Sequence, residues 1–330
     1  MSGKSRVGVV AALVLALVVV AAAGAWLWLK SSLRDDVYRT LDRIERDSKG
    51  AVKVKAGDLS VDPILRRATL RDVTIELKSP QGTPVTLRVD ELDVKKWEQL
   101  GDGSNLLREQ ALAWHGLRSP ELDAQIAHAS EPLKKVVGDA LVFDVAHHVS
   151  YQPEQDNGFE LDATATCLKL GQLTLHFSAS GIDLRQLTQV ARDQQASGRP
   201  PALDAEIRNR SVAAVVGAKL RGARLAVRSA GLFEAIVAIE ASRAGVSVEQ
   251  ARRNMQEQVR QKCAAPLAEP WTKRICPALT SFLDNPKSLS LTLAPAKPVA
   301  LSGVAMAALS SGPGAAIEQV GLSLAANEEK

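Results

Sequence analysis

Residues Val7 to Leu29 form an apolar run of 23 positions without one charged side chain. At about 1.5 Å per helical residue, a run of this length can cross the hydrocarbon core of a bilayer, which is about 30 Å thick. Trp26 and Trp28 stand near its end, where interfacial aromatic residues gather. The run predicts a transmembrane helix, and the residues after Lys30 are then a tethered domain.

A cleaved signal peptide is the alternative for this run, because the small residues Ala21 to Ala23 suit a signal peptidase. Signal-peptide apolar regions span about 7 to 15 residues, so the greater length here favours an uncleaved signal anchor. The flanking charges leave its orientation open. Basic residues stand on both sides: Lys4 and Arg6 before it, and Lys30, Arg34, Arg39, Arg43, Arg46 and Lys49 after it. Counted alone they would hold the domain in the cytoplasm, but this rule weakens for long translocated domains.

The composition of the chain is that of a folded protein rather than of a disordered tail. Hydrophobic residues make up 46% of its 330 residues and charged residues 24%, as in globular proteins. Aromatic residues are only 4%, which leaves few stacking platforms for single-stranded nucleic acid. The net charge is +4 and the sequence holds no dense lysine or arginine block, so we expect no nucleic-acid partner.

The residues after the apolar run predict an amphipathic linker helix over 30–50, since apolar residues recur there at helical spacing up to Gly50. From Ala51 the apolar period changes to two, which is typical of antiparallel strands with one apolar face. The alternation slips at Arg71–Asp72, which indicates a β-bulge or a change of strand twist. We interpret the apolar face as a candidate lipid groove. Its residues are Val52, Val54, Leu70, Val73, Ile75, Val85, Leu87 and Val89.

The chain from Val7 to Val94 resembles the start of AsmA-like bacterial envelope proteins, with a membrane helix, a short amphipathic helix and the strand segments Gly50–Val54 and Leu59–Leu77. The resemblance implies an inner-membrane anchor, a β-sheet groove in the periplasm, and work in lipid transport and outer-membrane homeostasis. It implies no catalytic residue. We therefore expect a single-pass protein of the bacterial inner membrane with the bulk of the chain in the periplasm.

The rest of the chain predicts a second meander over 141–180 and a helix that Asp183 caps. Ser197–Pro201 has the composition of a linker. Beyond it we expect strands near 203–207 and 220–227, helices over 232–244, 247–262 and 266–283, and closing strands around 289–293, 299–304 and 322–324.

These patterns predict an α+β fold: an N-terminal transmembrane helix, twisted antiparallel β-sheet meanders, and a helical segment in the C-terminal third. The expected divisions are a cytoplasmic N-terminus (1–6), the transmembrane helix (7–29), the linker helix (30–50), a β-rich periplasmic domain (51–197) and an α+β C-terminal domain or subdomain (202–330).

The sequence contains no recognisable motif of a catalytic site. Its five histidines fit no zinc-protease pattern, and His147 and His148 are neighbours on a strand, so they face opposite sides. It shows no nucleophile elbow, glycine-rich phosphate loop or zinc-type cysteine pair. We expect a protein that is not an enzyme, and we name no catalytic residue, no metal site and no cofactor.

Cys263 and Cys276 are predicted to form a disulfide in an oxidising compartment, because they bracket a short loop between two predicted helices. Two separate buried thiols are the alternative. Cys167 lies on the apolar side of its strand and is expected to be a core thiol.

The expected function is binding or transport of membrane lipid, or homeostasis of the cell envelope. An acyl chain in the groove would gain about 0.8 kcal/mol per buried CH₂. The alternative is a structural or scaffolding subunit of an inner-membrane or envelope-spanning complex, in which the protein's own helices fill the sheet face. Membrane lipid is the expected partner and other envelope proteins are a second. The sequence leaves the lipid, the protein partner and the oligomeric state open.

Overall fold

A computed structural model of the protein describes residues 45–46, 50–62, 67–78, 84–100, 106–197, 205–264 and 270–328. The predicted transmembrane helix (7–29) and most of the predicted linker helix (30–50) lie outside these residues. Within them, no helix is long and apolar enough to cross a membrane. The longest of the described helices, Val248–Ala264, has 17 residues and carries charges throughout. The expected localisation as a single-pass inner-membrane protein is therefore not supported.

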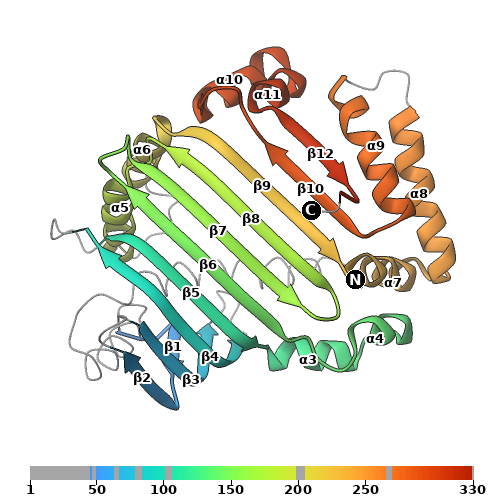
Figure 1. Ribbon diagram of the computed structural model, residues 1–330, viewed down its shortest axis with the longest axis horizontal. Coiled ribbons are helices and arrows are strands. Elements are labelled where there is room, and N and C mark those ends of the chain that lie inside the picture. Colours follow the sequence, from blue (N-terminus) through green and yellow to red (C-terminus); the bar gives the residue numbers. More distant parts are fainter. Residues whose placement is uncertain are drawn as a thin grey trace.

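All described strands belong to one antiparallel sheet (Figure 1). They are β1 (Val52–Lys55), β2 (Asp58–Asp62), β3 (Arg67–Lys78), β4 (Pro84–Gln99), β5 (Leu107–Leu117), β6 (Phe143–Gln152), β7 (Gly158–Cys167), β8 (Gly171–Ser180), β9 (Lys219–Ser229), β10 (Ser288–Leu293), β11 (Val299–Ala300) and β12 (Leu322–Ala326). Their order across the sheet is β1-β3-β4-β5-β6-β7-β8-β9-β10-β12, with β2 also paired to β3 and β11 to β9.

The predicted fold class is corrected: in place of a transmembrane helix, twisted antiparallel meanders and a helical segment in the C-terminal third, the described residues form one large antiparallel sheet with helices. Strand β8 pairs with β9 from Gly171↔Ser229 to Ser180↔Lys219, so the sheet continues through the predicted division at 197–202. The helices are also spread more widely, since the first one after β5 begins at Pro120. The physical reason is that β9 repeats the alternation of β8, and pairing with β8 satisfies its backbone hydrogen bonds.

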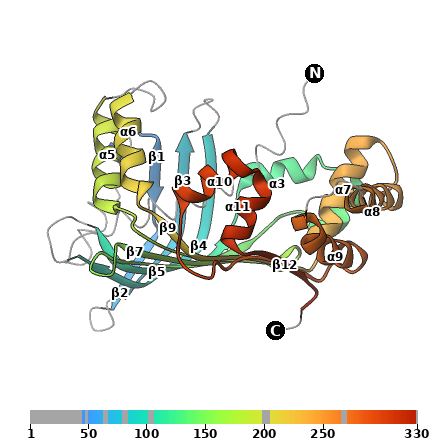
Figure 2. The ribbon, with the colours of Figure 1, turned by 90° about the horizontal axis from the view of Figure 1, so that it is seen from above.

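The helices from Pro120 onward lie on one side of the sheet (Figure 2) and along its margin (Figure 1). They are α3 (Pro120–Ala127), α4 (Glu131–Val137), α5 (Leu184–Ser197), α6 (Ala205–Val216), α7 (Leu232–Ala244), α8 (Val248–Ala264), α9 (Pro270–Asp284), α10 (Leu301–Ser311) and α11 (Pro313–Val320).

Several of these helices begin and end at residues that the sequence marks. The Asp183 carboxylate accepts the Gln186 N–H at 2.9 Å at the start of α5. The Ser247 hydroxyl accepts the Gln250 N–H at 3.1 Å at the start of α8. Gly245 ends α7 in the left-handed conformation that glycine adopts readily. The predicted N-cap Asp183 is therefore confirmed, and Ser247 has the same role at the start of α8.

Two segments predicted as strands are helical. Residues 205–207 of the strand expected over 203–207 belong to α6, and the strand expected over 299–304 is reduced to β11, after which the chain enters α10. Both helices are rich in alanine and free of proline, which favours helix over strand. A short apolar run has no period that separates the two structures, so these predictions were wrong.

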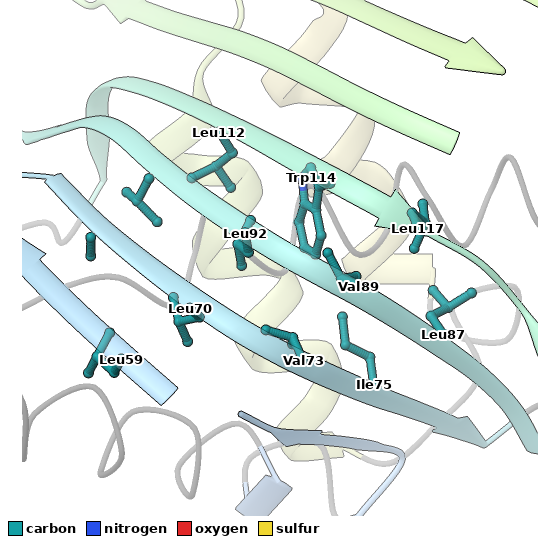
Figure 3. Packing of buried hydrophobic residues seen from close by; sticks show 12 residues of the cluster. Leu59, Leu70, Val73, Ile75, Leu87, Val89, Leu92, Leu112, Trp114 and Leu117 are labelled. Carbon is teal, nitrogen blue, oxygen red and sulfur yellow. The ribbon is translucent and has the colours of Figure 1, made fainter. Parts of the chain in front are cut away.

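The most fully buried part of the molecule is a group of twelve hydrophobic residues on β2 to β5 (Figure 3). We call it the buried cluster, and its members are Leu59, Ala68, Leu70, Val73, Ile75, Leu87, Val89, Leu92, Val94, Leu112, Trp114 and Leu117. The slip predicted at Arg71–Asp72 is confirmed, because Asp72 adopts a φ of 53°. There the partner of β3 changes from β2 to β1. The slip allows Leu70 and Val73, three positions apart, to enter the same cluster.

We expect Gly171→Ala to lower the free energy of unfolding by more than about 2 kcal/mol. Gly171 has a φ of 119°, and an added Cβ would lie 1.9 Å from the Arg228 carbonyl oxygen of β9. Urea denaturation measures the change. Gly312→Ala is the control, because Gly312 also has a positive φ, 86°, but an added Cβ would meet nothing within 4 Å. That variant should lose about 1 kcal/mol. Equal losses would contradict the close approach of β8 and β9.

Candidate functional site

The sheet has an apolar face and a polar face, because the register aligns the alternation of neighbouring strands. Val149 on β6 lies opposite Leu161 on β7, which lies opposite Phe177 on β8. The positions one residue away, such as His148 and Asp162, also pair with each other and point to the other face. The apolar side chains of many strands therefore form one continuous surface.

Five strands of this surface carry three rows of five apolar residues, which we call the open patch. The rows run across β7, β8, β9, β10 and β12 and are Ala163, Leu175, Leu225, Leu291 and Leu324; Ala165, Leu173, Val227, Leu289 and Ala326; and Leu161, Phe177, Ala223, Leu293 and Leu322. None of the fifteen is buried. Leu173 is 36% and Leu225 is 39% exposed, whereas every member of the buried cluster is at most 7% exposed.

Helices pack at the edge of the apolar face. At one end of β6 and β7, Phe143 and Cys167 contact a cluster that includes Ile126 of α3, Val137 of α4 and Ala235 of α7. At the β12 edge, the Asn327 amide donates to the Ser281 carbonyl oxygen of α9 at 3.0 Å. These contacts place the helices on the apolar side and near the ends of the strands, which agrees with their marginal positions in Figure 1.

The eight predicted groove residues lie at the other end of the same face. Leu70, Val73, Ile75, Leu87 and Val89 are buried, while Val52, Val54 and Val85 are half-buried and pack against them. The exposed part of the face lies instead on β7 to β12. The alternations that signal it, such as Leu173–Phe177 and Leu289–Leu293, were visible in the sequence but lay outside the segment that resembles AsmA-like proteins.

Two polar residues interrupt the apolar face between the buried cluster and the open patch. Gln110 on β5 is 1% exposed and His147 on β6 is 6% exposed. Within the part of the chain that the structure describes, no hydrogen-bond partner reaches the side-chain nitrogen and oxygen atoms of either residue. Burial, followed by the charge of His148, lowers the pKa of His147 to about 4. The His147 imidazole is therefore neutral at pH 7.

The other histidines of the sheet lie on its polar face, and each is paired with carboxylates. His148 lies 3.0 Å from Glu109, and His176 lies 2.7 Å from Asp162. A hydrogen bond from Lys96, with a smaller effect from His148, lowers the pKa of Glu109. Among the described residues, no group of three or more His, Cys, Asp or Glu side chains is placed to hold a metal ion. This face has the character of a solvated, salt-bridged surface.

The structure joins Cys263, at the end of α8, to Cys276, within α9, by a disulfide. The link ties two helices that also share an apolar cluster with α7. Cys167 is a buried free thiol in the cluster beneath α3, α4 and α7.

A family model described as an uncharacterized protein matches residues 164–327. The matched segment contains the whole open patch except Leu161 and Ala163. No curated protein matches the chain.

The two ends of the apolar face should differ in their tolerance of charge. We expect Val73→Asp to lower the free energy of unfolding by about 3 to 5 kcal/mol. Val73 is 1% exposed, so the carboxylate introduced by the substitution would be buried and unpaired. We expect Leu225→Asp to cost less than about 1 kcal/mol, since Leu225 is 39% exposed and water can reach the charge. Thermal and urea denaturation of both variants give the comparison. A similar collapse for Leu225→Asp would show that the open patch is part of a filled core.

His147 should make the fold sensitive to acid. Its pKa in the folded protein, about 4, lies below its ordinary value of 6.5, so the unfolded chain binds the proton first as the pH falls. Stability from this residue is complete above about pH 6.5 and is lost between pH 6.5 and 4. Between pH 7 and 4.5, wild type should lose about 2 to 3 kcal/mol more than His147→Leu. The free energy of unfolding of both proteins is measured by urea denaturation at the two pH values. The same loss for wild type and for His147→Leu would contradict this prediction.

Proposed function

We propose that this protein binds the acyl chains of membrane lipid on the open patch, and that it works as a non-catalytic lipid-binding or lipid-transport protein. The observation that carries the proposal is a set of fifteen apolar residues, aligned in three rows, none of which is buried. Leu173 and Leu225 are exposed and the other thirteen are half-buried, and contiguous apolar surfaces that water reaches mark binding sites for apolar ligands, membranes or other proteins. The resemblance of the N-terminal third to AsmA-like envelope proteins supports the choice of lipid.

The dimensions of the open patch suit an acyl chain. Five neighbouring strands at about 4.8 Å spacing give each row a length of about 19 Å. A bilayer core of about 30 Å contains two leaflets, so one acyl chain extends about 15 Å. A chain lying along a row would cover apolar side chains for its whole length, and each CH₂ that leaves water contributes about 0.8 kcal/mol.

The charged residues of β9 lie on the polar face of the sheet and so leave the open patch apolar. Arg224 and Arg228 flank Leu225 and Val227 along β9 but belong to the opposite face, where Arg224 lies across from His176. An acyl chain on the patch therefore meets no charged group from β9.

A structural or scaffolding role is the second candidate, and α10 favours it. This helix carries no charged residue, and Met306 and Leu309 are 63% and 83% exposed. Large apolar side chains turned to solvent on one helix suit the surface of a protein partner.

Bound lipid in purified protein tests the first candidate. We expect phospholipid to co-purify with the wild-type full chain in native mass spectrometry, and Leu225→Asp to retain less than about a tenth of it, because a carboxylate in the row would be desolvated by the acyl chain.

Ala226→Asp is the matched control, because Ala226 follows Leu225 on β9 but lies on the polar face. It should retain wild-type amounts of lipid. Absence of lipid from wild type, together with no binding of added dioleoyl phosphatidylglycerol, would defeat the proposal. The alternative result is that a protein partner binds the wild-type chain. If substitution of Leu309 abolishes that binding and substitution of Leu225 does not, the structural or scaffolding role is the better explanation.

A further inference from the structure

Gln110 and His147 are an exception to the way this protein handles buried polar groups. Most buried side-chain polar atoms in proteins have a hydrogen-bond partner, and each one without a partner requires an explanation. Across the described residues, five buried side-chain atoms have none, and four of them belong to these two residues. The fifth is Asp123 Oδ1 on α3, away from this part of the face.

The register brings Gln110 and His147 together. Gln110 lies opposite Val149, and Leu112 lies opposite His147, so the two polar residues are diagonal neighbours on adjacent strands. Diagonal pairs of this kind have their Cα atoms about 7 to 8 Å apart and their side chains on the same face. One ligand atom between them could therefore accept a hydrogen bond from both.

His147 also stands at the start of a row of the open patch, and Gln110 lies diagonal to it on β5. His147 lies opposite Ala163, the first residue of the row that continues through Leu175, Leu225, Leu291 and Leu324. On its other side, Leu112 is 2% exposed and belongs to the buried cluster. A chain lying in this row thus reaches His147, with Gln110 diagonal to it, where the face becomes a closed core.

The chemistry of the pair selects a neutral acceptor. The Gln110 amide offers two N–H donors, and a neutral imidazole offers one. The Gln110 amide carries no charge, and the His147 imidazole is neutral at pH 7 because burial lowers its pKa to about 4. A phosphate or free carboxylate would be expected to recruit arginine or lysine, whereas a carbonyl oxygen needs donors without charge.

We infer that Gln110 and His147 donate hydrogen bonds to the ester carbonyl oxygen of an acyl lipid whose chain lies along the open patch. This inference rests on the proposed function and adds the bond type that the site recognises. The ligand class is then an ester-linked lipid rather than a free fatty acid or a hydrocarbon. The carbonyl supplies the partner that both side chains lack.

The test compares two lipids that differ only in whether their two chains are ester-linked, with a carbonyl, or ether-linked, without one. Delipidated full-length protein is titrated with dioleoyl phosphatidylglycerol and with its diether analogue, which has the same head group and chains. We expect the ester to bind about tenfold more tightly, as one or two neutral hydrogen bonds provide. In the double variant Gln110→Leu/His147→Leu the preference should disappear, with the ether affinity unchanged.

Stability separates recognition from a merely structural role. Replacing unpartnered polar groups by apolar ones of similar size should leave the melting temperature of the delipidated protein unchanged or higher. The single variants Gln110→Leu and His147→Leu should each lose about threefold of the ester preference. Leu112→Met, a swap of similar volume on the same face, should alter neither melting nor preference.

Three results would overturn the inference. Equal affinity of wild type for ester and ether would remove the carbonyl from recognition while leaving lipid binding intact. A preference retained in the double variant would assign recognition to other residues. Failure of wild type to bind either lipid would defeat the proposed function together with this inference.

Discussion

The rest of the structure depends on one constraint: in an antiparallel ladder, the register fixes which face every side chain occupies. A shift of one residue between β8 and β9 would move Leu225 to the polar face and bring Arg224 to the apolar one. Where the apolar period slips, the backbone compensates, as at Asp72 with its φ of 53°. The sheet can therefore add strand after strand, across long helical insertions, and keep one apolar face throughout.

The helices that follow β9 bury apolar residues against one another. In the C-terminal part, Phe233 and Val237 of α7 pack with Leu283 of α9, and the ring of Phe233 lies 5.7 Å from that of Phe282. These helices bury apolar area against one another, and the Cys263–Cys276 link fastens α8 to α9. The rows on β7 to β12 stay partly exposed. At the β3 to β5 end the same face is buried.

Local patterns predicted much of this fold, and long-range ones did not. The strands from Leu141 to Ser180, the helix over 232–244 and the caps at Asp183 and Ser247 follow from period and capping chemistry. The pairing of β8 with β9 could not be predicted, because 38 residues separate them and alternation alone names no partner. The candidate face was recognised as apolar, but its filled and open ends could not be told apart. Val73 and Leu225 both belong to alternating apolar segments of the sequence, and only the structure shows that the first is buried and the second exposed.

In the binding mode that we infer, the polar pair on the apolar face lowers stability in exchange for recognition of the lipid. A sequence selected for stability alone would place leucine or valine at 110 and 147, since an unsatisfied buried polar group costs about 1 to 3 kcal/mol. Residues that break a local rule without compensation in the folded chain are expected where the compensation comes from a ligand. His147 illustrates this: its neighbour His148 has a carboxylate partner at 3.0 Å, whereas His147 has none among the described residues. The alternation of the strand decides which histidine is paired at the surface and which one faces the apolar side of the sheet.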